Sequence, residues 1–269
     1  MRPYSFSKLD MYLKCPRYYK FTYIEKIPAQ KDSYSLGLEI HKFIGEYAQT
    51  GNRKLNLAVI EESDQEFVQN SFDSAVSVLN GLGKIVGVDV RFALDDSSQL
   101  TDFYDNDSLI RGVIDLITEQ DDGLHVWDWK VGKQKNHNIL QLRIYMLAVS
   151  RIFVDKKVVS AGLIYLPSTR CDIIQNDQSF EQVWNELKAL IDKIENDKTF
   201  EPRIGEHCNY CPYQALCPIW SKVKKNGSRP MTFHNFMATY EKMPRELQKQ
   251  IENIILDYIQ DSESAEPTI

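Results

Sequence analysis

The sequence has no apolar run long enough to span a membrane and no phosphate-binding motif of the G-x-x-x-x-G-K-[ST] type. Its N-terminus lacks the basic and apolar regions of a secretory signal, and the chain has no internal repeat or low-complexity tract. These absences argue against a membrane or secreted protein and against a chain with its own nucleotide-driven motor. They predict a cytoplasmic protein, in which structural disulfides are rare.

Acidic residues outnumber basic ones, 38 to 32, which gives a formal net charge of −6 over 269 residues. A negative total argues against a protein that coats nucleic acid passively. The basic residues nevertheless gather locally, where they either track a phosphate backbone or form solvated faces. Three clusters contain Lys8, Lys14, Arg17 and Lys20; Lys130, Lys133, Lys135 and Arg143; and Lys222, Lys224, Lys225 and Arg229.

The order of predicted elements indicates an α/β fold with a mixed sheet flanked by helices. Helical periodicity covers residues 7–14, 37–50, 62–80, 136–152 and 178–196. Strand patterns cover residues 86–94, 109–117, 123–131, 157–166 and 170–175. At 43% hydrophobic residues, the chain can bury one sizeable core.

We expect one domain over residues 1–225, whose last part, 197–225, contains three of the cysteines together with prolines that limit regular structure. Residues 226–269 are expected to form a linker, an amphipathic helix near 243–260 and a disordered tail.

Charged residues interrupt two predicted strands, at Asp115 in RGVIDLI and at Asp128 and Lys130 in VWDWKV. Because strand side chains alternate between faces, Asp128 and Lys130 point one way and Trp127 and Trp129 the other. Burying an unpaired carboxylate or ammonium is costly, so each needs a partner. Either a buried Asp–Lys ion pair joins two strands, or Asp115 and Asp128 hold a divalent metal with Lys130 beside the attacking water.

This order, an Asp, then Asp-x-Lys about a dozen residues later, then a helix, resembles the core of the PD-(D/E)xK nucleases. The Pro-Asp dipeptide of that name survives only as Asp115 of Ile114-Asp115. The resemblance implies a restriction-endonuclease-like core in which Asp115 and Asp128 bind Mg²⁺ or Mn²⁺ and Lys130 is catalytic.

Three further residues narrow the resemblance to the RecB-like branch. His41 lies beside an apolar stripe in GLEIHKFIGEY, and Gln141 and Tyr145, four residues apart, share a helix face. Taken alone, His41 is more often a capped or solvated residue than a ligand, and the helix could simply bury an aromatic ring and expose an amide. The resemblance implies that His41 ligates the metal and that Gln141 and Tyr145 orient the DNA backbone and the active site.

RecB-like proteins usually place a Glu on the strand before that of Asp115, and this chain has Asp89 there, in VGVDVRFAL. Strand alternation predicts Val88 and Phe92 on one face, with Asp89 and Arg91 on the other. Asp89 is either an accessory of the metal site or a charge on a half-exposed strand.

Three cysteines, Cys208, Cys211 and Cys217, lie together in HCNYCPYQALCP, and Cys15 lies far upstream in KCPRYYKF. In a cytoplasmic protein such clustered thiols favour metal binding. Three thiolates leave a tetrahedral site one ligand short, and Cys15, which is also followed by proline and aromatic residues, is the natural fourth.

The other two candidate ligands are given lesser roles. Cys171 stands alone on a predicted strand and is expected to be a small buried hydrophobe. His207 directly precedes Cys208 and is taken as a bystander.

One cysteine near the N-terminus and three near the C-terminus resemble the iron–sulfur members of the RecB-like family. That family includes CRISPR-associated nucleases of spacer acquisition and the nuclease domains of AddB-type helicase–nucleases. The resemblance implies a four-iron four-sulfur cluster on Cys15, Cys208, Cys211 and Cys217 that staples the N- and C-terminal segments together. Zinc is the alternative, because four thiolates also suit a structural zinc site.

The function implied is that of a Mg²⁺- or Mn²⁺-dependent DNA exonuclease acting on single-stranded DNA or DNA ends. Its context would be phage or plasmid recombination, or CRISPR spacer processing. Without a motor motif, it takes ends as they are or borrows unwinding from a helicase partner. The alternative is a non-motor DNA-binding and end-trimming subunit of a helicase–nuclease or integrase complex. A purely structural protein with a zinc staple is a third hypothesis, disfavoured because all the matched positions are intact.

Overall fold

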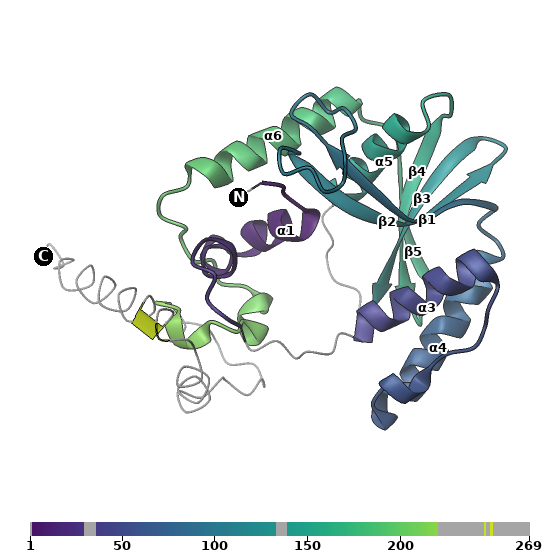
Figure 1. Cartoon of the computed structure of the whole chain (residues 1–269), viewed down its shortest axis with the longest axis horizontal. Coiled ribbons are helices and arrows are strands. Elements are labelled where there is room, and N and C mark those ends of the chain that lie inside the picture. The colour runs from purple at the N-terminus through teal and green to yellow at the C-terminus, as the bar shows by residue number, and fades with distance from the viewer. Residues whose placement is uncertain (1, 30–35, 133–138, 220–244, 246–247, 250–269) are drawn as a thin grey trace, which may run out of the picture. The chain divides into compact units, whose positions relative to one another are not determined.

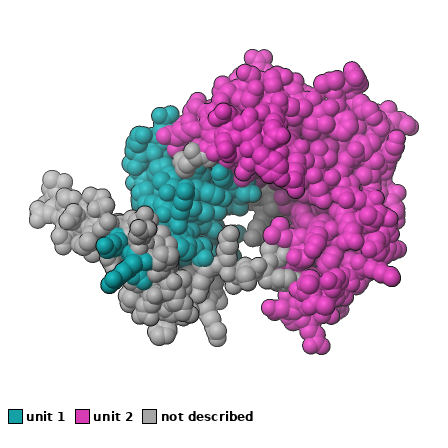
Figure 2. Space-filling model, in the orientation of Figure 1, with its two compact units in different colours: residues 1, 7–32, 196–269 teal, residues 2–6, 33–195 magenta. Residues whose placement is uncertain are grey.

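The computed structural model describes residues 2–29, 36–132 and 139–219, together with 245, 248 and 249. The chain divides into two compact units (Figure 2). The core unit contains residues 2–6 and 33–195, and the terminal unit contains residues 1, 7–32 and 196–269. The predicted linker and tail, and most of the predicted C-terminal helix, lie outside the described residues.

The core unit contains a five-stranded mixed sheet in the order β1-β2-β3-β4-β5 (Figure 1). The pair β3–β4 is parallel and the other neighbours are antiparallel. A parallel pair needs a crossover, and α5 (Leu140–Ile152) supplies it. The strands are β1 (Lys84–Leu94), β2 (Ile110–Gln120), β3 (Gly123–Val131), β4 (Val158–Leu166) and β5 (Arg170–Gln175). The predicted α/β fold with a helix-flanked mixed sheet is confirmed.

Helices cover both faces of this sheet (Figure 1). Trp127 and Trp129 of β3 join a core cluster with α3 (Leu36–Thr50) and α4 (Glu62–Leu79). Lys130, which points to the opposite face, contacts Gln141 of α5. The alternation predicted for β3 is therefore correct, and it assigns α3 and α4 to one face and α5 to the other.

The alternation predicted for β1 is wrong. Val88 packs against the α3–α4 cluster, whereas the ring of Phe92 lies 5.8 Å from that of Tyr145 on α5. Between them, Asp89 has a φ of 51°, which is uncommon for a non-glycine residue. Because of this backbone irregularity, Val88 and Phe92 point to opposite faces of the sheet. The apolar residues of β1 are therefore divided between two helix layers.

The terminal unit brings sequence-distant segments together. It contains most of α1 (Phe6–Lys14), with α2 (Pro16–Tyr19), a π-helical turn (Lys20–Ile24) and two 3₁₀ turns (Glu206–Tyr210 and Gln214–Leu216). The hydroxyl of Tyr12 donates to Asp197 at 2.7 Å, and that of Tyr213 donates to the carbonyl of Ile27 at 2.9 Å. Buried hydroxyls paired in this way tie residues 7–29 to residues 197–219.

The remaining long helix is α6 (Phe180–Asn196), close to its predicted range. Every strand and helix predicted within the described residues is present, with bounds shifted by up to four residues at one end. No described helix has both the length and the apolar character needed to cross a membrane.

Ile164 of β4 is fully buried in the core cluster with α3 and α4. Replacing it with alanine should lower the free energy of unfolding by about 2–5 kcal/mol. The matched change at Ile173, which is 52% exposed on β5, should cost less than about 1 kcal/mol. Urea unfolding followed by tryptophan fluorescence compares them. Equal losses would contradict the packing described for Ile164.

Candidate active site

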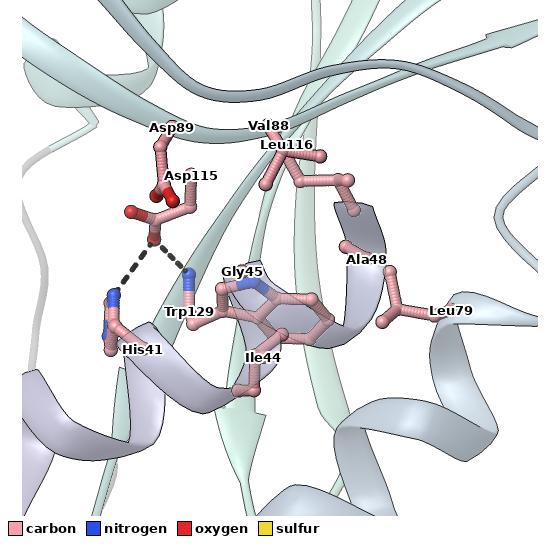
Figure 3. Close-up of a pocket in the computed structure, with 10 residues that line it drawn as sticks. All are labelled: His41, Ile44, Gly45, Ala48, Leu79, Val88, Asp89, Asp115, Leu116 and Trp129. Atoms are coloured by element: carbon pink, nitrogen blue, oxygen red, sulfur yellow. Dashed lines mark hydrogen bonds and ion pairs between the residues drawn. The ribbon is translucent and has the colours of Figure 1, made fainter. Parts of the chain in front are cut away.

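The predicted carboxylates meet where two strands separate. Pairing between β2 and β3 ends at Leu116 and Trp127, after which β2 continues with β1 and β3 with β4. Asp115 and Asp128 are the first residues past that last pair. The backbone N–H of Trp129 donates to Asp115 Oδ2 at 2.8 Å across the gap (Figure 3). The strand fork therefore holds two carboxylates at one place.

Asp128 is almost completely buried. Burial, followed by the charge of Asp115, raises the pKa of Asp128 to about 6, although Lys130 and His41 oppose the rise. Two carboxylates so close repel each other, and each keeps its charge more readily beside a cation.

His41 reaches the same fork from α3, where Ile40 and Ile44 are buried as their helical spacing predicts. Its Nδ1 lies 3.3 Å from Asp115 Oδ2. Burial alone lowers the pKa of His41, but the hydrogen bond to Asp115 and the charges of Asp115 and Asp128 outweigh it and raise the pKa. The structure thus brings His41 together with both carboxylates.

Asp89 lies at this site as well. It lines a cavity of about 10 Å³ together with His41 and Asp115 (Figure 3). Burial and the charge of Asp115 raise the pKa of Asp89. A β-carbon added to Gly45 of α3 would lie 2.7 Å from Asp89 Oδ2, so the glycine makes room for this carboxylate. Asp89 therefore borders the cavity while its side chain stays exposed to solvent.

Lys130, Gln141 and Tyr145 surround Asp128 from the α5 side. Gln141 Nε2 donates to Asp128 Oδ1 at 2.9 Å and to the Tyr145 hydroxyl at 3.0 Å, while Lys130 Nζ donates to Gln141 Oε1 at 3.1 Å. Gln141 is 8% exposed and Tyr145 7% exposed, so the predicted helix face is buried against the site.

The ion pair expected as an alternative is present, because Lys130 Nζ lies 2.5 Å from Asp128 Oδ2. That oxygen is buried and accepts no hydrogen bond of ordinary geometry, since the ammonium is close but poorly aligned. A buried carboxylate oxygen without a donor is available to a cation.

The donor set suits a hard divalent ion. Asp89, Asp115 and Asp128 offer carboxylate oxygens, which Mg²⁺ and Mn²⁺ prefer, and His41 offers a ring nitrogen. Within the described ranges, no three His, Cys, Asp or Glu side chains already stand at metal-ligating distances. The chemistry of the donors, the small cavity and the unsatisfied oxygen of Asp128 fit a divalent metal.

Gly45 is the site residue that the sequence analysis missed. It lies four residues after His41 in the middle of α3, where glycine costs about 1 kcal/mol relative to alanine. A glycine tolerated there at such a cost is a signal of close approach by a neighbouring group.

The four predicted cluster cysteines belong to the terminal unit. Cys15 and Cys208 are buried, and Cys211 and Cys217 are partly buried. Burial is the main cause that raises the pKa of Cys211 to about 12, and the charges of the other three thiols add to it. All four are therefore near one another, and a bound cation would relieve the repulsion between their thiolates.

One expectation about the remaining residues is wrong. Cys171 is exposed on the edge strand β5 and is not a buried hydrophobe. Nε2 of His207 lies 3.7 Å from Cys208 Sγ, next to the predicted cluster ligands.

Comparison with known proteins gives one family match. The model of the PD-(D/E)XK nuclease superfamily matches residues 3–218, which include every candidate residue named above. No curated protein matches the chain. The crystal structure of SSO0001 matches with a TM-score of 0.41 and 15% identity, over 80% of this chain and 85% of that one.

Substituting Gly45 with alanine should push the Asp89 carboxylate out of the cavity and lower Mn²⁺ affinity on the order of 10-fold. Helix stability should not fall, because alanine is favoured by about 1 kcal/mol inside a helix. Calorimetric titration with Mn²⁺ measures the affinity. Gly81→Ala, whose β-carbon would meet nothing closer than 3.6 Å, is the control. Unchanged affinity in Gly45→Ala would remove Asp89 from the site.

Proposed function

The chain belongs to the PD-(D/E)XK nuclease superfamily, and from this premise we propose that it is a Mg²⁺- or Mn²⁺-dependent deoxyribonuclease that degrades single-stranded DNA or DNA ends. Membership implies a nucleic-acid substrate. The observation that carries the proposal is the fork between β2 and β3, where Asp115, Asp128 and Lys130 meet.

In this proposal His41, Asp115 and Asp128 hold the cation, with Asp89 as an accessory. When bound, a divalent cation supplies positive charge to the reacting phosphate and lowers the pKa of a bound water. The residues already carry interactions suited to these roles. The N–H of Trp129 fixes one oxygen of Asp115, and Gln141 fixes one oxygen of Asp128. Asp115 Oδ1 and Asp128 Oδ2 take no part in these two hydrogen bonds.

Lys130 is the proposed catalytic cation. Its ammonium is held by Asp128 and Gln141, so its charge stays beside the carboxylates and can orient an attacking water or neutralise a phosphate oxygen. Gln141 positions both partners, and Tyr145 in turn accepts a hydrogen bond from Gln141. These two residues act through Asp128 and Lys130.

We further propose the RecB-like branch and an exonuclease that takes DNA ends as it finds them. The match of His41 and the Gln141–Tyr145 pair to that branch supports the assignment, and the geometry around Asp128 is compatible with it. The biological setting would be CRISPR spacer processing or phage and plasmid recombination. Co-purification with an integrase favours the first, and activity of the isolated chain on free ends favours the second.

Four cysteines are proposed to hold a four-iron four-sulfur cluster as a second metal centre. The support is their gathering from residues 15 and 208–217 into one compact unit, with two of the thiols buried. Such a cluster joins the two ends of a nuclease domain that we propose to span residues 1–225.

Asp115→Ala, Asp128→Ala and Lys130→Ala should each lower nuclease activity on the order of a thousandfold, or about 4 kcal/mol of transition-state stabilisation. His41→Ala should have a smaller effect, because three carboxylates remain. Degradation of labelled single-stranded DNA with Mg²⁺ or Mn²⁺ measures the rates.

The control is Asp73→Ala on α4, whose side chain is 51% exposed and remote in sequence from the fork. It should keep wild-type activity, while circular dichroism checks the fold of each variant. Wild-type rates in folded Asp128→Ala protein would sink the proposed active site.

Protein purified without oxygen should be brown and contain iron and sulfide. Alanine at Cys15, Cys208, Cys211 or Cys217 should bleach it and lower its solubility, because the cluster loses a ligand. Cys171→Ala should do neither, because Cys171 is exposed on β5 of the core unit. Elemental analysis distinguishes the outcomes, since stoichiometric zinc without iron would replace the cluster with a zinc site and leave the nuclease proposal intact.

A further inference from the structure

The ring of His207 lies beside the thiol of Cys208 and close to the thiol of Cys15. Its Nε2 is 3.7 Å from Cys208 Sγ. Burial opposes the shift, but His207 and the backbone of Arg203 lower the pKa of the nearby Cys15 thiol. We propose that His207 is a positioning residue of the cysteine centre, whose Nε2–H donates to the metal-bound sulfur of Cys208. This inference rests on the proposed cluster.

The backbone of Arg203 shares these contacts. Its N–H donates to Cys15 Sγ at 3.5 Å, and its carbonyl accepts from Cys208 Sγ at 3.7 Å and lies 3.1 Å from His207 Nε2. A metal-bound cysteine is a thiolate and has no S–H to donate. The sulfur of Cys208 then becomes an acceptor, and the Arg203 carbonyl needs another donor. An N–H at Nε2 of His207 faces both atoms.

Gly205 shows that this place is shaped for the ring. A β-carbon on Gly205 would lie 2.8 Å from Cε1 and 2.9 Å from Nδ1 of His207. The backbone of Gly205 is extended, with a φ of −168°, so its dihedral angle does not demand glycine. The close approach of the histidine ring is what requires a glycine at this position. The segment 203–208 thus places one side chain and one peptide against two cluster ligands.

Hydrogen bonds to cluster sulfurs stabilise the added electron of the reduced state and raise the reduction potential. A residue that only fills space changes cluster retention without changing the potential of the clusters that remain. The two roles therefore separate in a measurement of potential.

The experiment uses the full chain, purified without oxygen, as wild type, His207→Ala, His207→Gln and Gly205→Ala. Each is titrated with a chemical reductant, and the reduced cluster is followed by electron paramagnetic resonance. His207→Ala should shift the potential to more negative values, and glutamine, which keeps an N–H donor, should recover part of the shift. Gly205→Ala should shift it in the same direction by displacing the ring, whereas Gly81→Ala should match the wild type.

A wild-type potential in iron-loaded His207→Ala overturns the inference and leaves the cluster in place. Equal potentials in the glutamine and alanine variants also overturn it, because the donor then has no effect. If His207→Ala loses its iron, a more negative potential in Gly205→Ala than in the wild type supports the inference. Wild-type potentials in both His207→Gln and Gly205→Ala overturn it. If the wild-type protein contains no iron, the proposed cluster is wrong, and this inference is wrong with it.

Discussion

The separation of β2 from β3 after the pair Leu116–Trp127 is the constraint on which the site depends. A continuous ladder would pair the backbone of Trp129 with β2 and leave no space between the strands. In the fork, the N–H of Trp129 instead donates to the carboxylate of Asp115. A side chain thus replaces a ladder partner, which satisfies a backbone donor and fixes the carboxylate in one step.

Concentrating carboxylates at such a point is unfavourable unless neighbours compensate. The raised pKa values of Asp89 and Asp128 reflect burial and the nearby charge of Asp115. Lys130 and His41 offset part of this cost with positive charge, and Gln141 with a hydrogen bond. The remaining imbalance is characteristic of functional sites, where local stability gives way to chemistry. Gly45 shows the same compromise, since helix propensity is given up for the position of one carboxylate.

The terminal unit solves a different problem. Its described part contains short helices and 3₁₀ turns, with a small apolar cluster of Phe21, Ile27 and Tyr213. Hydroxyl–carboxylate and hydroxyl–carbonyl pairs join its two segments. A unit with so little regular structure would gain much from the proposed metal centre, because a crosslink between Cys15 and Cys208 would close a long loop of the chain.

Local pattern in the sequence was sufficient for the element order, the two-faced character of β3 and the grouping of Gln141 with Tyr145. Each follows from a period of two or of 3.6 residues, which acts over a few residues. The pattern of β1 misled, because one residue with positive φ, Asp89, exchanges the faces and no periodicity encodes it. Likewise, the exposure of Cys171 depends on β5 being the edge of the sheet, which is a property of strand order. The sequence left open whether Lys130 pairs with Asp128 or serves a metal site. In the fold, the ion pair and the candidate metal site lie at the same point. The approach of Gly45 to Asp89 and of His207 to Cys15 joins residues far apart in the chain, so only tertiary packing could decide them.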